Sequence, residues 1–114
     1  MEQFLNDSQN LWKRKAYLYI IKFENEQNIY KFGITTDFTR RKANLKQEWK
    51  NRNIEIVIDV LTLIPVQSLA KAIILESKIR WKLLSKKIKV FGNDYFKTED
   101  IKNTLNIIQK IIEK

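Results

Sequence analysis

Residues 16–23 follow the two-residue period of a β-strand, with side chains pointing alternately to two faces. One face would carry Tyr17, Tyr19, Ile21 and Phe23, and the other would carry Leu18, Ile20 and Lys22. The polar segment 24–28 predicts a turn, and residues 28–35 predict a second strand that returns beside the first. The pattern therefore indicates a β-hairpin.

The register of this hairpin decides which side chains become neighbours. With Phe23 opposite Ile29, Tyr19 lies opposite Gly33 and is a diagonal neighbour of Lys31 on the same face. A slip of one residue would place Tyr19 and Lys31 on different faces. The sequence leaves both registers open, and the first would bring a phenol, an amine and a glycine together.

Two further elements follow the hairpin. Asp37 is suited to cap a helix over residues 38–50, whose apolar residues recur at helical spacing as Phe38, Leu45 and Trp49. Arg41 lies one turn before Leu45, beside this stripe. Residues 54–64 alternate and are rich in β-branched side chains, so they predict a third strand, which Pro65 would end.

The second half of the chain is mainly helical in pattern. Residues 67–85 predict a long helix with an inward stripe of Leu69, Ile73, Glu76, Arg80 and Leu83. Residues 91–94 (FGND) predict a turn, after which Tyr95 and Phe96 would pack on the domain. A last helix over residues 99–113 would bury Ile101, Leu105, Ile108 and Ile112.

These elements predict an α+β fold in which helices pack a small three-stranded antiparallel sheet. A chain of 114 residues is long enough for one domain. We expect that domain to span residues 16–114, preceded by an N-terminal arm or short helix over residues 1–15.

The composition narrows the range of partners and chemistries. With 22 Lys and Arg against 13 Asp and Glu, the formal charge is +9, which favours nucleic acid as the partner over a mere lysine-rich bias. The absence of Cys and His excludes disulfides, a Cys/His zinc site and an imidazole base. No leader-like start or apolar run of spanning length occurs, so we expect a soluble, cytoplasmic protein without a membrane partner.

Four short motifs, taken in their order along the chain, resemble the GIY-YIG nuclease superfamily. They are YLY at 17–19, KFG at 31–33, FGITTDFTRRKANL at 32–45 and AIILESKIR at 72–80. The third is similar to the glycine, threonine and double-arginine stretch of the GIY-YIG-like branch common in phage genomes. Each motif alone is weak, and their common order and spacing carry the resemblance.

The resemblance implies a GIY-YIG-like domain whose catalytic residues are Tyr19, Lys31, Arg41 and Glu76. Glu76 would be the metal ligand for one Mg²⁺ or Mn²⁺, and Arg41 would hold the phosphate with its planar fork. Tyr19 would take the proton of the attacking water if positive charge lowered the pKa of the phenol, and we expect Lys31 to supply that charge.

The chain departs from the family pattern at three places. Lys31 replaces the second tyrosine, and Arg80 stands where the branch often has a histidine. Residues 92–96 (GNDYF) resemble a segment of the branch in which an acidic residue precedes an aromatic pair, but Asp94 is shorter than the glutamate usual there. In an alternative alignment, Asn93 matches the family's late asparagine. Tyr17, Gly33 and Thr35, which belong to the same motifs, are secondary candidates.

Basic residues flank the predicted catalytic positions at several points of the chain. The candidates for nucleic-acid binding are Lys13, Arg14, Lys15, Arg40, Lys42, Lys86 and Lys87. Simpler structural roles remain alternatives for the site residues: half-buried strand aromatics for the tyrosines, an edge-strand charge for Lys31 and an intrahelical ion pair for Glu76 with Arg80.

Three functions compete on these grounds. The first is a metal-dependent DNA endonuclease or nicking enzyme, and the sequence does not decide between DNA and RNA as the substrate. Because the chain is too short for a separate recognition domain, we expect specificity that is low or that is supplied by a homodimer or a partner protein. The second is a nucleic-acid-binding module on the same fold that has lost catalysis, and the third is a protein-binding inhibitor module that uses its apolar helices.

Overall fold

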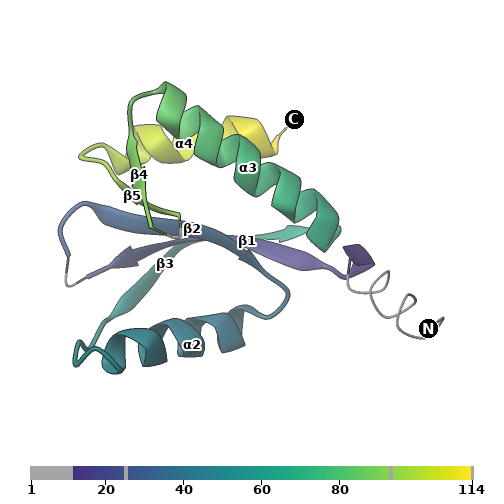
Figure 1. Ribbon diagram of the computed structural model, residues 1–114. Coiled ribbons are helices and arrows are strands. Elements are labelled where there is room, and N and C mark those ends of the chain that lie inside the picture. The colour runs from purple at the N-terminus through teal and green to yellow at the C-terminus, as the bar shows by residue number, and fades with distance from the viewer. Residues whose placement is uncertain (1–11, 25, 93, 114) are drawn as a thin grey trace.

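Five antiparallel strands form the central sheet, in the order β3-β1-β2-β5-β4 (Figure 1). The strands are β1 (Ala16–Phe23), β2 (Ile29–Thr35), β3 (Ile58–Val66), β4 (Lys89–Phe91) and β5 (Tyr95–Lys97). The helices are α2 (Phe38–Lys50), α3 (Leu69–Ser85) and α4 (Ile101–Ile112). This computed structural model describes residues 12–24, 26–92 and 94–113. Most of the predicted N-terminal arm or short helix lies outside the described residues.

The predicted α+β class is confirmed, but the prediction of three strands is wrong. Strands β4 and β5 are three residues each and form a hairpin that adds to the outer edge of β2. Three residues are too few to show a two-residue period. The sequence pattern therefore predicted only a turn at residues 91–94, followed by two aromatic residues that pack on the domain. The turn itself is present, with Gly92 and Asp94 at positive φ.

The β1–β2 hairpin has the first of the two registers considered, in which Tyr19 and Lys31 share a face. Tyr19 lies opposite Gly33, and Ile21 lies opposite Lys31. Strand β1 lies between β3 and β2, so both of its edges are paired, and side chains pack against both of its faces. Tyr19 and Ile21 are buried on one face, and Leu18 is buried on the other.

Strand β3 differs from its prediction at both ends. It begins at Ile58 rather than at 54, and it continues through Pro65 to Val66. Pro65 lies opposite Tyr17 on an edge strand, where a residue without an N–H is tolerated because one side of the strand has no ladder. Position in the sheet therefore overrides the local effect of the proline.

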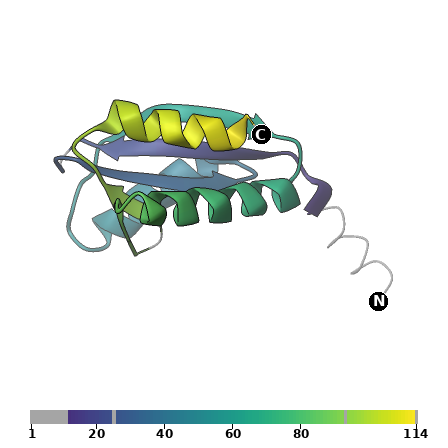
Figure 2. The same ribbon diagram turned by 90° about the horizontal axis from the view of Figure 1, so that it is seen from above.

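Helices cover both faces of the sheet. Helix α2 packs on one face, while α3 and α4 lie side by side on the other (Figure 1, Figure 2). The core under α3 and α4 includes Phe32, Ile79, Phe96 and Ile108, whereas the core under α2 includes Leu45. None of the helices among the described residues has the length and apolar character needed to cross a bilayer.

Side-chain caps set the helix starts. Asp37 accepts a hydrogen bond from the backbone N–H of Arg40, as predicted for α2. Ser68 caps α3 and Asp100 caps α4, so both helices begin about two residues later than predicted. Helix α4 buries Ile108 fully, and Ile101, Leu105 and Ile112 pack against the same core as predicted.

The buried face of α3 is rotated slightly about the helix axis relative to the predicted stripe. Its fully buried members are Ala72, Ile79 and Leu83. Glu76 and Arg80 stand at the margin of this buried face and are partly exposed, with side-chain exposures of 21% and 37%. A charged pair at the margin avoids the full cost of burying ions in the core.

Candidate active site

The β1–β2 hairpin brings the Tyr19 phenol against the Gly33 backbone. A Cβ built on Gly33 would overlap the hydroxyl and ring atoms of Tyr19. Gly33 lies in an extended strand, so the requirement for glycine here is the close approach of the phenol and not an unusual φ. The structure thus accounts for one of the two glycines in the chain.

Helix α2 carries Arg41 to the same phenol. The Arg41 Nε–H donates a hydrogen bond to the Tyr19 hydroxyl over 3.4 Å, and the Phe38 ring packs against the Tyr19 ring at 5.4 Å between centroids. On its other side, Arg41 Nη1 lies 3.6 Å from Oε1 of Glu48, two turns along the helix. The predicted Arg41 position is therefore fixed by a phenol and a carboxylate.

Burial raises the pKa of Tyr19 above its usual value, because the phenolate would lose solvation among apolar residues. The hydrogen bond and charge of Arg41 act in the opposite direction without reversing this effect. The expectation of a lowered phenol pKa is therefore wrong. Arg41 bonds the hydroxyl and is the cation that opposes this rise, an electrostatic role that was expected for Lys31.

Lys31 is buried on the same face, with 3% of its surface exposed. It lies opposite Tyr95 of β5, and its Nζ is 4.8 Å from the centre of the Tyr95 ring. Burial lowers the pKa of Lys31 and Arg41 lowers it further, while Asp94 and Glu76 act to raise it. The alternative of a solvent-exposed edge lysine is wrong, because β5 covers this edge of β2.

Glu76 and Arg80 come from α3, which runs beside β2. Arg80 forms a bidentate pair with Asp94, with both N···O distances 2.8 Å, and its Nη2 is 3.5 Å from Oε1 of Glu76. The intrahelical pair exists, but the shorter bonds of Arg80 are to Asp94. Burial raises the pKa of Glu76, as does Asp94, while Arg80 and Lys31 lower it.

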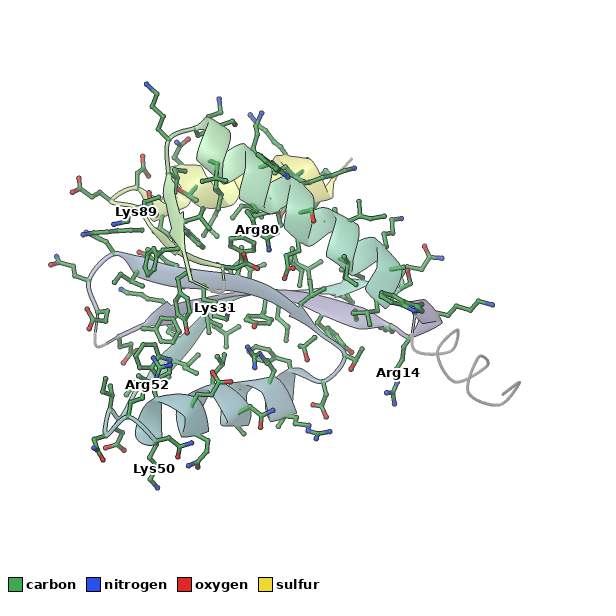
Figure 3. All side chains as sticks on the ribbon, viewed as in Figure 1. Arg14, Lys31, Lys50, Arg52, Arg80 and Lys89 are labelled. Atoms are coloured by element: carbon green, nitrogen blue, oxygen red, sulfur yellow. The ribbon has the colours of Figure 1, made fainter. Side chains whose placement is uncertain are left out.

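The four predicted catalytic residues thus lie in one region of the domain. Tyr19, Lys31, Arg41 and Glu76 come from β1, β2, α2 and α3, and Glu76 is close enough to affect the pKa of both Tyr19 and Lys31. Figure 3 shows Lys31 and Arg80 between α2 and α3. Tyr19 and Lys31 are buried, whereas Arg41 and Glu76 are partly exposed, so an approaching ligand meets the latter two first.

The donor set suits a largely hydrated divalent cation. The described residues contain no group of three or more Asp, Glu, His or Cys side chains that could hold a metal ion. Mg²⁺ and Mn²⁺ accept one or two carboxylates with water in the remaining positions, which Glu76 satisfies. Asp94 is held by Arg80, and Glu76 keeps a raised pKa that a nearby cation would lower.

The secondary candidates Tyr17 and Thr35 lie at the end of the β1–β2 hairpin. Tyr17 lies opposite Thr35 at the end of the hairpin, and Lys15 Nζ is 5.9 Å from its ring centre. The Thr35 hydroxyl bonds the backbone of Asp37, so it shapes the turn into α2. Asn93 lies outside the described residues.

The predicted binding residues do not gather at one point. Lys13, Arg14 and Lys15 are exposed before β1, where the Arg14 carbonyl accepts the Leu69 N–H at the start of α3. The exposed pair Lys86 and Lys87 follows the other end of α3, which at 17 residues is about 25 Å long. Arg40 and Lys42 flank Arg41 on α2.

Two residues at the site were missed by sequence reasoning. The place of Tyr95 beside Lys31 depends on the β2–β5 register, which no local pattern reveals. The proximity of Glu48 to Arg41 could have been predicted from the sequence, because residues seven apart on a helix share a face.

No protein-family model, curated protein or solved structure matches this chain.

Proposed function

We propose that the chain is a metal-dependent endonuclease or nicking enzyme that hydrolyses phosphodiester bonds in DNA. The observation that carries the proposal is the convergence of Tyr19, Arg41 and Glu76 from three separate elements, with Arg41 hydrogen-bonded to the phenol. The +9 charge supports a polyanionic substrate. Bringing polar and charged groups together in a partly buried place costs free energy, and such clusters are common at functional sites.

Each residue has a role that its position allows. Arg41 is the partly exposed cation and would bind the scissile phosphate. Tyr19 keeps its proton because burial raises its pKa, so it would position the attacking water through its hydroxyl, which Arg41 holds in place by a hydrogen bond. Glu76 would hold Mg²⁺ or Mn²⁺, which supplies charge stabilisation on the phosphoryl oxygens and a more acidic water. Lys31 adds positive charge beneath the site.

A second candidate is a nucleic-acid-binding module without catalysis. It is favoured by the bidentate Arg80–Asp94 pair, which places a guanidinium 3.5 Å from Glu76, where a metal would bind. The raised pKa of Tyr19 also leaves the phenol protonated at neutral pH. Both candidates predict the same affinity for phosphates and differ only in cleavage.

Conversion of supercoiled plasmid to open-circular DNA tests the proposal. The purified chain is incubated with plasmid in Mg²⁺, in Mn²⁺ and in EDTA, and gel shifts in EDTA measure binding separately. Metal-dependent nicking supports the endonuclease. Binding without nicking in either metal supports the second candidate, and an absence of binding at low salt contradicts both. A parallel assay on single-stranded RNA determines whether RNA is also a substrate.

A further inference from the structure

A cavity of about 870 Å³ lies beside the candidate active site, on the α2 side of the sheet. Four aromatic rings line it: Phe23, Trp49, Phe91 and Tyr95. Tyr95 stacks between Phe23 and Phe91, with centroids 5.5 and 5.9 Å away, and it meets Trp49 edge-on at 6.4 Å. We refer to this cavity as the aromatic pocket. Its volume is in the range of sites for small organic groups.

The charged side chains that line the aromatic pocket have a net negative charge, whereas the whole chain has a net positive charge. Glu26 and Glu48 line it with Arg52, which gives two carboxylates against one guanidinium in a chain of charge +9. A phosphate inside would meet like charge. Carboxylates instead accept hydrogen bonds from amino groups, such as the exocyclic amine of cytosine.

The rings of the aromatic pocket also argue against a small organic cation as the occupant. Arg52 already lies over the Trp49 ring at 5.6 Å, and Lys31 lies over Tyr95 at 4.8 Å. A further cation would be repelled by both. A flat, neutral group with hydrogen-bond donors at its edge fits aromatic walls and carboxylates together, and a nucleobase has these properties.

Two residues connect the aromatic pocket to the candidate active site. Tyr95 lines the pocket and also contacts Lys31 with its ring. Glu48 lines the pocket, and its Oε1 lies 3.6 Å from Nη1 of Arg41. A nucleic acid strand with its phosphate at Arg41 therefore has a neighbouring base within reach of the pocket. Arg52 follows the end of α2, lies on the side of that helix toward the sheet (Figure 3), and supplies the positive charge of the pocket lining.

We propose that the aromatic pocket binds one unpaired nucleobase of the strand whose phosphate lies at Arg41. This inference rests on the proposed function and specifies its substrate class. Bases in a duplex are stacked inside the helix, so the substrate is nucleic acid with unpaired nucleotides, such as a single strand, a flap or a bulge. Bases with an exocyclic amine bind in preference to thymine.

Tryptophan fluorescence tests this site directly. Trp12→Phe with Trp81→Phe removes two exposed indoles outside the pocket, which leaves Trp49 as the only tryptophan. In EDTA, a short single-stranded oligo(dC) should quench Trp49, and a blunt duplex at the same nucleotide concentration should not. In a parallel titration, oligo(dC) should bind more tightly than oligo(dT). Circular dichroism shows whether each variant is folded.

Phe91→Ala is the test variant, because Phe91 is 37% exposed and its removal leaves most of the core in place. Loss of one aromatic contact should weaken oligo(dC) binding about tenfold, which corresponds to ~1.4 kcal/mol, because bases stack on aromatic side chains. Trp81→Ala is the matched control: this indole is 71% exposed on α3, outside the pocket, and its loss should leave affinity unchanged. Glu26→Ala should reduce the ratio of oligo(dC) to oligo(dT) affinity.

The outcomes separate this proposal from the proposed function. Oligonucleotide binding without a change in Trp49 fluorescence, or with equal affinity in Phe91→Ala and the parent, overturns the pocket and leaves the nuclease standing. Trp49 quenching with a weakened Phe91→Ala variant, but without metal-dependent cleavage of any substrate, supports the pocket and overturns the nuclease. Equal quenching by single strand and duplex would contradict the preference for unpaired bases.

Discussion

The Arg41 guanidinium donates to the Tyr19 hydroxyl over 3.4 Å, and the two residues are 22 positions apart in the chain. A hairpin register and a capped helix together produce this contact. Asp37 fixes the first turn of α2, and the pairing of Tyr19 with Gly33 leaves the phenol facing that helix. The contact joins the cation expected to bind phosphate to the group proposed to position the attacking water.

Arg41→Lys should therefore reduce cleavage more than binding. Lysine keeps the positive charge but loses the planar fork that serves the phenol and a phosphate together. We expect cleavage to fall about 100-fold, in the range for loss of one donor to a transition state, with a small change in DNA affinity. Lys46→Arg, which exchanges one cation for the other at an exposed position of the same helix, is the control. Equal losses in binding and cleavage would reduce Arg41 to a phosphate anchor.

Gly33→Ala should destabilise the fold through the Tyr19 phenol. The added Cβ overlaps atoms of the Tyr19 ring, so we expect a loss of about 1–3 kcal/mol in the free energy of unfolding by urea. In a Tyr19→Ala background the obstruction is absent, and Gly33→Ala should cost much less. Additive losses in this double-mutant cycle would refute the contact as the reason for glycine.

The ionisation of Tyr19 should depend on Arg41 more than on Lys31. Burial raises the pKa of Tyr19 above 10.0, and Arg41 opposes that rise. NMR titration of the Tyr19 ring carbon, assigned with Tyr19→Phe, should therefore show ionisation above pH 10.0. Arg41→Met should move it to higher pH, and Lys31→Met should move it less. A larger shift in Lys31→Met would restore Lys31 to the role first expected from the sequence.

Glu76 should make stability fall as the pH rises from acid toward neutral. Its pKa is raised above 4.5 in the folded chain, so the folded state holds the proton more tightly than the unfolded state. This contribution is fully present below the unfolded pKa and is lost as the pH rises through the folded pKa. Urea unfolding of Glu76→Gln should lack the decline that begins near pH 4.5. The same decline in the variant would assign it to another group.

Local patterns predicted the start of α2 but did not reveal the short strands of the sheet. Capping at Asp37 is as predicted, and Tyr19 pairs with Gly33 in one of the two registers considered. The four candidate catalytic positions came from the family resemblance, and the structure brings them into one region of the domain. Strands β4 and β5 are too short to have a period, so the burial of Lys31 and its contact with Tyr95 followed from pairing that only the folded chain shows.

The sequence also could not predict which partner Arg80 has or whether Pro65 is tolerated within a strand. The stripe containing Glu76 suggested two partners, Arg80 or a metal, and the structure adds Asp94 as the closer partner of Arg80. Pro65 was expected to end a strand, yet an edge position allows β3 to continue through it. In both cases, the deciding interaction comes from a segment distant in sequence.

Metal-dependent nicking by Glu76→Gln tests the account most directly. The parent, Glu76→Gln and Glu99→Gln, an exposed position before α4, are compared on supercoiled plasmid with Mg²⁺ or Mn²⁺. We predict that the parent and Glu99→Gln nick the plasmid and that Glu76→Gln does not, while all three bind DNA equally in EDTA. A folded Glu76→Gln protein that nicks as fast as the parent would contradict the assignment of Glu76 as the metal ligand.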